Sequence, residues 1–316
     1  MHEYTVELDG LTREAAGLPA TVAYPLIGAI YHGAKGSVRL EIDGRSAAPG
    51  VEPSWLGQVA DFRVEVADEF SGLKVRAPTL GRVCPDKFAT GMLFGEPIAE
   101  LSAFSFLFRA LSDALEGRTD SEACDQALLR MFAEFSQVLA AGVSVITIKD
   151  GRGRSPAMQI DPPGLTRASS LRDRTPAARQ VHVAGTLDPN PYSEDAFTLL
   201  LQDAERTRIR GYLSEALQRD VLRSYRGKEV ALSALVHFRP DGAPFRIEAQ
   251  HVRLATDNDL SVFSEVPQPL ESQLEVTSLT RPQGPSTGIN AIWGRWPGDE
   301  SADEIINALE RAERRS

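Results

Sequence analysis

The sequence predicts an α+β protein in which a mixed α/β N-terminal domain precedes a small OB-like β-barrel and an extended C-terminal tail. In the first half of the 316-residue chain, segments with an apolar residue at every second position alternate with segments of helical periodicity. Between residues 181 and 249, five short alternating segments occur with one helical segment between the third and the fourth. This is the element order of an OB-type barrel, and a small SH3-like barrel is the competing assignment.

The composition is ordinary for a globular protein, with 42% hydrophobic and 25% charged residues. The net charge of −10 argues against broad coating of nucleic acid and against binding to anionic membranes, because both need a basic surface. Cys84 and Cys124 form no CxxC pair, so neither a disulfide framework nor a thiolate zinc site is expected. The first residues lack a leader pattern and no apolar run approaches the length of a membrane span, so the cytoplasm is the expected location.

The N-terminal domain is expected to cover about residues 1–155. A helix is expected from Leu18 and Pro19 onward, although Pro25 falls inside it. A short capped helix is expected at 53–56, and the neighbouring strands 62–66 and 73–77 are expected to form a hairpin. The complete set of predicted strands in this domain is 4–8, 37–42, 62–66, 73–77 and 143–148.

Residues 101–139 predict two helices that form an antiparallel hairpin. The first, 101–115, places its large apolar residues on one face. Thr119-x-x-Glu122 has the form of a capping box that starts the second helix, whose apolar face reaches Leu139. The short connection between the two helices favours an antiparallel arrangement.

The remaining boundaries follow from composition. Residues 156–177 are rich in Pro, Arg and Ser with weak periodicity, which predicts a linker. The barrel is expected at 178–256, a second linker at 257–287, and a partner-binding tail at 288–316. The predicted barrel strands are 181–183, 197–201, 208–212, 230–236 and 245–249, with a helix near 215–222.

No catalytic motif is present, because Gly-x-Ser-x-Gly, Walker A, HExxH and EF-hand patterns are all missing from the sequence. The sequence therefore predicts a protein that is not an enzyme and that needs no cofactor and no metal. His182, His237 and His251 lie on or beside barrel strands without ligand spacing, and we interpret them as ordinary strand positions. Carboxylates that are scattered in sequence but gathered in space keep a metal-dependent hydrolase as an alternative.

Barrels of the OB type often bind single strands through aromatic side chains and a basic groove. Between Val181 and Ala255, ten Lys and Arg residues balance ten Asp and Glu residues, so no basic footprint is predicted. Arg206, Arg208 and Arg210 alternate along one segment and are the best candidates for a nucleic-acid contact, although a solvated strand face explains them more simply. A nucleic-acid-binding regulator that uses the barrel is the first alternative function.

The tail holds two of the three tryptophans, Trp293 and Trp296, beyond a polar, proline-bearing segment at 281–286. Large aromatic side chains outside a folded body usually need a surface that covers them, and Trp is enriched among interface anchors. Ser301-x-x-Glu304 then predicts a helix start. A helix of about fourteen residues is marginal alone in water, so either a partner protein or the chain's own body is expected to cover its apolar stripe.

The string from Trp293 to Glu300, Trp-Gly-Arg-Trp-Pro-Gly-Asp-Glu, resembles the C-terminal tails of small bacterial antitoxins that partner PIN-domain ribonucleases. The resemblance covers about residues 288–316, and residues 1–270 resemble the bodies of other bacterial proteins that carry such a tail. It implies that the tail wraps a toxin and occludes its acidic, magnesium-binding active site. The body departs from that family, because such antitoxins are usually short and their N-terminal DNA-binding ribbon is not visible here.

The resemblance and the aromatic anchors together predict a non-catalytic, antitoxin-like neutraliser of a PIN-type RNase. Arg295 is the candidate to reach the acidic site, since a guanidinium pairs with carboxylates bidentately, and three later arginines are reserves for this role. The reserves are Arg311, Arg314 and Arg315. The predicted partner-binding residues are Trp293, Arg295, Trp296, Pro297, Asp299, Glu300, Ile305, Ile306 and Leu309.

Overall fold

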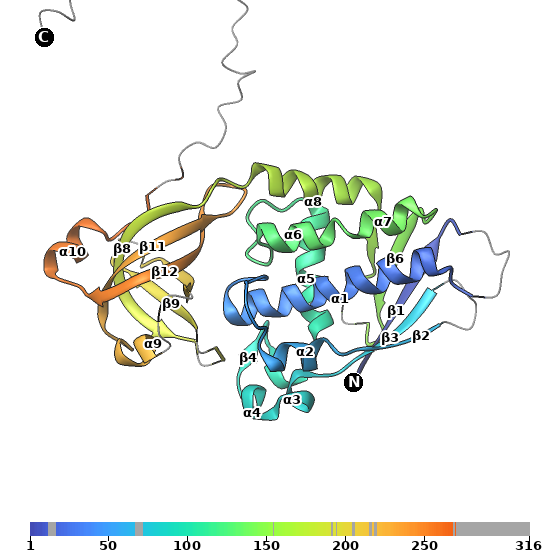
Figure 1. Cartoon of the computed structure of the whole chain (residues 1–316), viewed down its shortest axis with the longest axis horizontal. Coiled ribbons are helices and arrows are strands. Elements are labelled where there is room, and N and C mark those ends of the chain that lie inside the picture. Colours follow the sequence, from blue (N-terminus) through green and yellow to red (C-terminus); the bar gives the residue numbers. More distant parts are fainter. Residues whose placement is uncertain are drawn as a thin grey trace, which may run out of the picture. The chain divides into compact units, whose positions relative to one another are not determined.

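The computed structural model describes residues 1–267 and 269, except 12–16, 67–71, 154, 191, 194, 204–205, 215–216 and 218–219 (Figure 1). The chain divides into two units, Met1–Ser272 and Gln273–Ser316. The predicted tail at 288–316 belongs to the second unit and lies outside the described residues. Within the first unit, helices and a mixed set of strands precede a closed barrel, which is the predicted α+β architecture.

The N-terminal part is built on a five-stranded antiparallel sheet in the order β2-β3-β1-β6-β7. The first strand of the chain is therefore the central one, and its alternation directs Tyr4, Val6 and Leu8 into the core. The strands are β1 (His2–Asp9), β2 (Arg63–Val66), β3 (Gly72–Ala77), β6 (Val145–Asp150) and β7 (Met158–Ile160).

Five helices pack on this sheet and on one another. The longest, α1, contacts α5, α6 and α7, and α8 contacts the same three helices (Figure 1). A Cβ atom at Gly36 of α1 would lie 2.7 Å from the Met131 sulfur of α6, so the Met131 side chain packs directly on the α1 backbone and would have to shift if residue 36 had a side chain. The helices are α1 (Ala20–Asp43), α5 (Ala103–Glu116), α6 (Gln126–Phe132), α7 (Phe135–Ala140) and α8 (Pro162–Arg174).

Short elements connect these helices and strands and close the core. Phe88 and Ile98 in these connections are fully buried. Phe104 at the start of α5, which follows these connections, stacks on Tyr4 with ring centroids 4.6 Å apart and so joins α5 to the sheet. The short elements are α2 (Ser54–Ala60), α3 (Leu80–Val83), α4 (Pro85–Phe88), β4 (Met92–Leu93), β5 (Glu96–Pro97) and the 3₁₀ helix η1 (Ile98–Glu100).

The second half of the first unit is a closed five-stranded barrel in the order β10-β12-β11-β8-β9. All its strand pairs are antiparallel except the parallel pair β10 and β12. The barrel has its own core, yet Phe245 of β12 belongs to the core of the N-terminal part. Its elements are β8 (Arg179–Pro189), β9 (Ala196–Leu201), β10 (Arg208–Leu213), α9 (Asp220–Ser224), β11 (Glu229–Phe238), β12 (Pro244–Leu254) and α10 (Asp257–Val262).

The strand predicted at 37–42 is wrong, because these residues form the last turns of α1. This part of the helix is covered by its neighbours on most sides, and buried residues such as Val38, Leu40 and Ile42 imitate a two-residue period. The helix predicted from Leu18 and Pro19 is confirmed, with Pro25 in its second turn.

The capping box predicted at Thr119 and Glu122 does not start a helix. The second helix starts at Gln126, where the Asp125 carboxylate accepts a hydrogen bond from the Leu128 backbone N–H, and it is interrupted before α7. The predicted helical hairpin is not confirmed, because α5 and α6 make their extensive contacts with α1 and α8.

The segment predicted as a linker at 156–177 contains β7 and α8. Asp161 accepts a hydrogen bond from the Gly164 N–H and Pro162 occupies the first helical position, so this Asp-Pro pair begins the helix. Only four residues of α8 are buried, which explains its weak periodicity. The second predicted linker, 257–287, begins with α10, and most of it lies outside the described residues. None of the described helices is both long enough and apolar enough to cross a membrane.

Candidate functional site

The predicted partner-binding residues and the reserve arginines lie outside the described residues. These residues are Trp293, Arg295, Trp296, Pro297, Asp299, Glu300, Ile305, Ile306, Leu309, Arg311, Arg314 and Arg315. The sites that the structure describes are therefore on the barrel and the N-terminal part.

The three arginines proposed for nucleic-acid contact have separate surroundings. Arg208 and Arg210 are exposed on the same face of β10, as the alternation predicts. Arg206 precedes the strand in a turn, with a φ of 51°. The Arg210 guanidinium forms an ion pair with Glu41 near the end of α1, so its charge is neutralised within the chain. Arg206, Arg208 and Arg210 therefore do not form one continuous basic surface with unpaired charges.

One side of the barrel contacts the N-terminal part through the connection between β8 and β9. Asn190 Nδ2 donates to the Ile42 carbonyl at 3.2 Å, and Ser193 Oγ donates to Asp43 at 2.9 Å. Tyr192 Oη donates to the Thr90 carbonyl at 3.0 Å. These bonds attach the barrel to the end of α1 and to the segment after α4.

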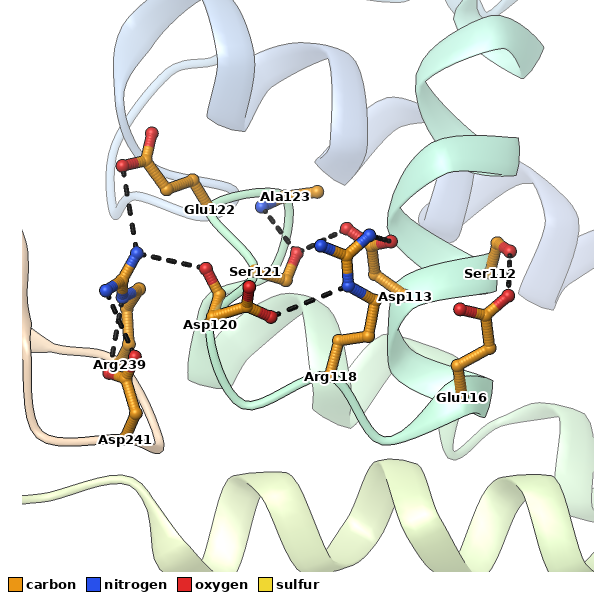
Figure 2. A network of polar contacts seen from close by, with 10 residues as sticks. All are labelled: Ser112, Asp113, Glu116, Arg118, Asp120, Ser121, Glu122, Ala123, Arg239 and Asp241. Carbon is orange, nitrogen blue, oxygen red and sulfur yellow. Dashed lines mark hydrogen bonds and ion pairs between the residues drawn. The ribbon is translucent and has the colours of Figure 1, made fainter.

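A second contact involves the turn between β11 and β12 (Figure 2). Arg239 Nη1 donates to the Asp120 carbonyl at 3.0 Å and lies 4.0 Å from the Glu122 carboxylate. Asp241, in the same turn as Arg239, forms an ion pair with this guanidinium, with 3.0 Å between Asp241 Oδ2 and Arg239 Nη2. The loop before α6 is thus held against the barrel.

The same loop is tied to α5 (Figure 2). The Asp113 carboxylate accepts a hydrogen bond from Ser121 Oγ at 2.6 Å and from Arg118 Nη1 at 3.2 Å. Ser121 Oγ in turn accepts from the Ala123 N–H at 3.0 Å. The loop therefore has a defined shape where it meets the barrel.

A cavity of about 320 Å³ lies between the barrel, the loop before α6 and the end of α8. This volume is at the lower end of the range of small-molecule pockets. Its wall combines small and apolar side chains with several charged ones. The lining residues are Gly44, Arg45, Ala47, Asp113, Ala114, Arg118, Ser121, Cys124, Asp125, Gln126, Ala127, Leu129, Arg130, Leu171, Thr175, Pro176, Ala178, Tyr212, His237, Phe238, Pro240, Phe245 and Arg246.

Arg246 of β12 is the most unusual side chain in this wall. It is 1% exposed, and none of its three guanidinium nitrogens has a hydrogen-bond partner in the part of the chain that the structure describes. The guanidinium lies over the Phe245 ring, 4.7 Å from the centroid. Burial, together with the nearby Arg210, lowers the pKa of Arg246 to about 10, so the side chain remains a cation at neutral pH.

Three carboxylates, those of Glu41, Glu122 and Asp125, raise the pKa of Arg246 through their negative charge, but each of them interacts directly with other groups. Glu41 pairs with Arg210, and Glu122 lies beside Arg239. Asp125 accepts from the Ser46 N–H at 2.9 Å and from the Leu128 N–H at 2.7 Å. Within the described residues, the cation of Arg246 therefore lacks a direct counter-ion.

Tyr212, His237 and Glu248 form a second polar group beside Arg246. Tyr212 Oη lies 3.2 Å from His237 Nε2 and 3.5 Å from Glu248 Oε2. Burial raises the pKa of Tyr212 and, against the attraction of Glu248, lowers the pKa of His237. Both side chains are therefore neutral at pH 7. Arg45 lies over the Tyr212 ring at 5.0 Å and adds a further cation to the cavity wall.

His182 and His237 lie in different surroundings. His182 lies against the Phe263 ring at 5.5 Å, whereas His237 contacts Tyr212. Among the described residues, no group of three or more His, Cys, Asp or Glu side chains is arranged to hold a metal ion. Cys84 and Cys124 are free thiols.

Sequence reasoning missed Arg246 and the cavity around it. The alternation in β12 shows that Arg246 is on the opposite face from the buried Ile247, which normally means solvent. The cover comes from segments that are distant in sequence, the end of α1, the loop before α6 and the end of α8, and no local pattern reports it. Comparisons of the chain with protein-family models, curated proteins and solved structures gave no match.

Proposed function

We propose that this protein is a non-catalytic binding protein that captures a partner protein in the cytoplasm through residues 288–316, and that the partner is a PIN-type RNase. The observation that carries the proposal is the tail sequence, which places Trp293 and Trp296 three positions apart beyond the folded body. Such side chains bind by burial in a partner's pockets. The helix that the sequence predicts after them would supply Ile305, Ile306 and Leu309 for a groove.

The barrel supports this choice over nucleic-acid binding. We also propose that the barrel is of the OB type, and three features favour this assignment. The third and fifth strands, β10 and β12, are parallel; the first strand, β8, pairs with the second and the fourth; and α9 lies between the third and the fourth strands. Barrels of this type bind oligonucleotides on the second and third strands and on the loops between strands one and two and strands four and five.

In this protein, the two loops and the third strand contact the N-terminal part of the same chain. The loop between β8 and β9 bonds to α1 through Asn190 and Ser193, and the loop between β11 and β12 bonds to Asp120 through Arg239. On the third strand, Arg210 is paired with Glu41. A single strand would have to displace these contacts, so the tail is the better candidate for partner binding.

We therefore expect the full chain to bind single-stranded DNA more weakly than a Kd of ~10⁻⁴ M at physiological salt, the weak end of non-specific binding. Filter binding across a salt series measures this. Tight binding that falls steeply with salt, and that is lost in Arg208→Glu/Arg210→Glu, would instead support the regulator function.

The proposed function is tested by inhibition of a PIN-type ribonuclease from a neighbouring reading frame. We expect the full chain to inhibit the enzyme and to co-purify with it, and a chain that ends at residue 287 to do neither, because it lacks both tryptophans and the apolar stripe. Equal melting temperatures of the two chains would establish that the body is intact. Equal inhibition by the shortened chain would contradict the proposal.

A further inference from the structure

The wall of the cavity beside the barrel includes the buried guanidinium of Arg246, which has no hydrogen-bond or ion-pair partner among the described residues. Taking a guanidinium out of water is costly unless it is paired and hydrogen-bonded. Arg246 is 1% exposed and, within the described residues, has no hydrogen-bond partner on any of its three nitrogens. Such a group in a folded protein calls for an explanation, and an anion that is bound from solution provides one.

The protein itself does not supply that anion among the described residues. The carboxylates of Glu41 and Asp125 are held by Arg210 and by the Ser46 N–H, respectively. Arg246 and Arg45 are instead among the residues that line the cavity of about 320 Å³. The charged residues of the wall are four arginines, Arg45, Arg118, Arg130 and Arg246, and two aspartates, Asp113 and Asp125, so cations outnumber carboxylates and an anion is attracted.

The rest of the wall restricts the kind of anion. Ala114, Leu129, Leu171 and Phe238 line the same cavity and offer apolar contact. Tyr212 and His237, which are both neutral at pH 7, lie in the wall and offer hydrogen bonds to polar atoms of the ligand. The cavity therefore suits a compact molecule with one charged end and one apolar end.

We propose that this cavity binds a small organic anion whose phosphate or carboxylate head pairs with the guanidinium of Arg246. A guanidinium offers two parallel N–H donors to either kind of head, which is the strongest geometry for such a pair. The ligand would contact the barrel through Arg246 and the N-terminal part through the loop that holds Asp125, so it would stabilise the folded body. This site is separate from the proposed partner-binding tail.

The test uses the full chain with two probes of the same ring size, phenyl phosphate and benzoate, at constant ionic strength. Thermal denaturation and isothermal titration calorimetry are recorded for the native chain and for Arg246→Met. We expect at least one probe to raise the melting temperature of the native chain, whereas sodium chloride at equal ionic strength does not. We expect Arg246→Met to bind that probe about tenfold more weakly or worse, because the charge-assisted bonds are lost.

Two further variants make the result specific. Arg208→Met removes an exposed arginine from the neighbouring strand β10 and is expected to bind like the native chain. Arg246→Gln keeps a shorter, uncharged polar end and provides the same measurement if the methionine variant does not fold. The probe that binds shows whether the head is a phosphate or a carboxylate. The proposal is overturned if neither probe stabilises the native chain, or if the Arg246 variants respond as the native chain does.

Discussion

Replacing Trp293 and Trp296 together with alanine is expected to weaken binding of the partner protein about a thousandfold or more. Interface tryptophans that act as anchors each contribute ~2 kcal/mol or more, so the loss of both corresponds to ~4 kcal/mol. Each ring would bury ~150–250 Å² against the partner. Isothermal titration of the PIN-type ribonuclease with the native chain and the double variant measures the difference.

Two control variants separate anchoring from general disturbance of the tail. Trp293→Phe/Trp296→Phe keeps large rings and is expected to retain a substantial part of the affinity. Asn307→Ala changes a polar position of the predicted helix and is expected to have little effect. Circular dichroism of the alanine variant shows whether the body is folded. Unchanged partner binding, or unfolding of the body, would indicate that the tail docks on its own chain.

Phe104→Ala is expected to lower the free energy of unfolding by about 3–5 kcal/mol, the usual cost of removing a buried phenylalanine side chain. Phe104 is fully buried, stacks on Tyr4 and meets the Phe62 ring edge-on at 5.4 Å. It therefore joins α5 to the central strand and to the residue before β2. A loss of this size is a large part of the total stability of a typical domain.

Urea denaturation measures this effect as a shift of the midpoint at a constant slope. Tyr24→Ala is the matched control, because Tyr24 is 85% exposed on α1 and alanine favours the helix. We expect the control to change the free energy of unfolding by about 0.5 kcal/mol or less. Similar midpoints for Phe104→Ala and Tyr24→Ala would mean that the core does not depend on the Phe104 contacts.

The sequence predicted those elements that have one buried and one exposed face. The barrel strands follow directly from such alternation, as do β1 and β3. Prediction failed where burial was unusual. The end of α1 is covered on most sides and imitated a strand, whereas α8 buries so few residues that it resembled a linker.

The cavity could not be predicted for a different reason. A strand pattern reports which residues share a face, but not what covers that face. On β12, Arg246 pairs in register with Arg210 of β10 and with His237 of β11. The sequence alternation predicts that these three polar side chains lie on the outer face of the barrel. Only the fold brings the loop before α6 onto that side and turns Arg246 from a surface residue into a buried one.

The central place of β1 in the sheet has a consequence for how the chain folds during synthesis. β1 ends at Asp9, but one of its two neighbours, β6, begins only at Val145. At a translation rate of 5–20 residues per second, the ribosome needs about 7 to 27 seconds to make the intervening chain. During this time the edge of β1 that later pairs with β6 stays open, because β3 pairs with the opposite edge. A nascent chain with this strand order is therefore expected to depend on chaperones until residue 150 has emerged.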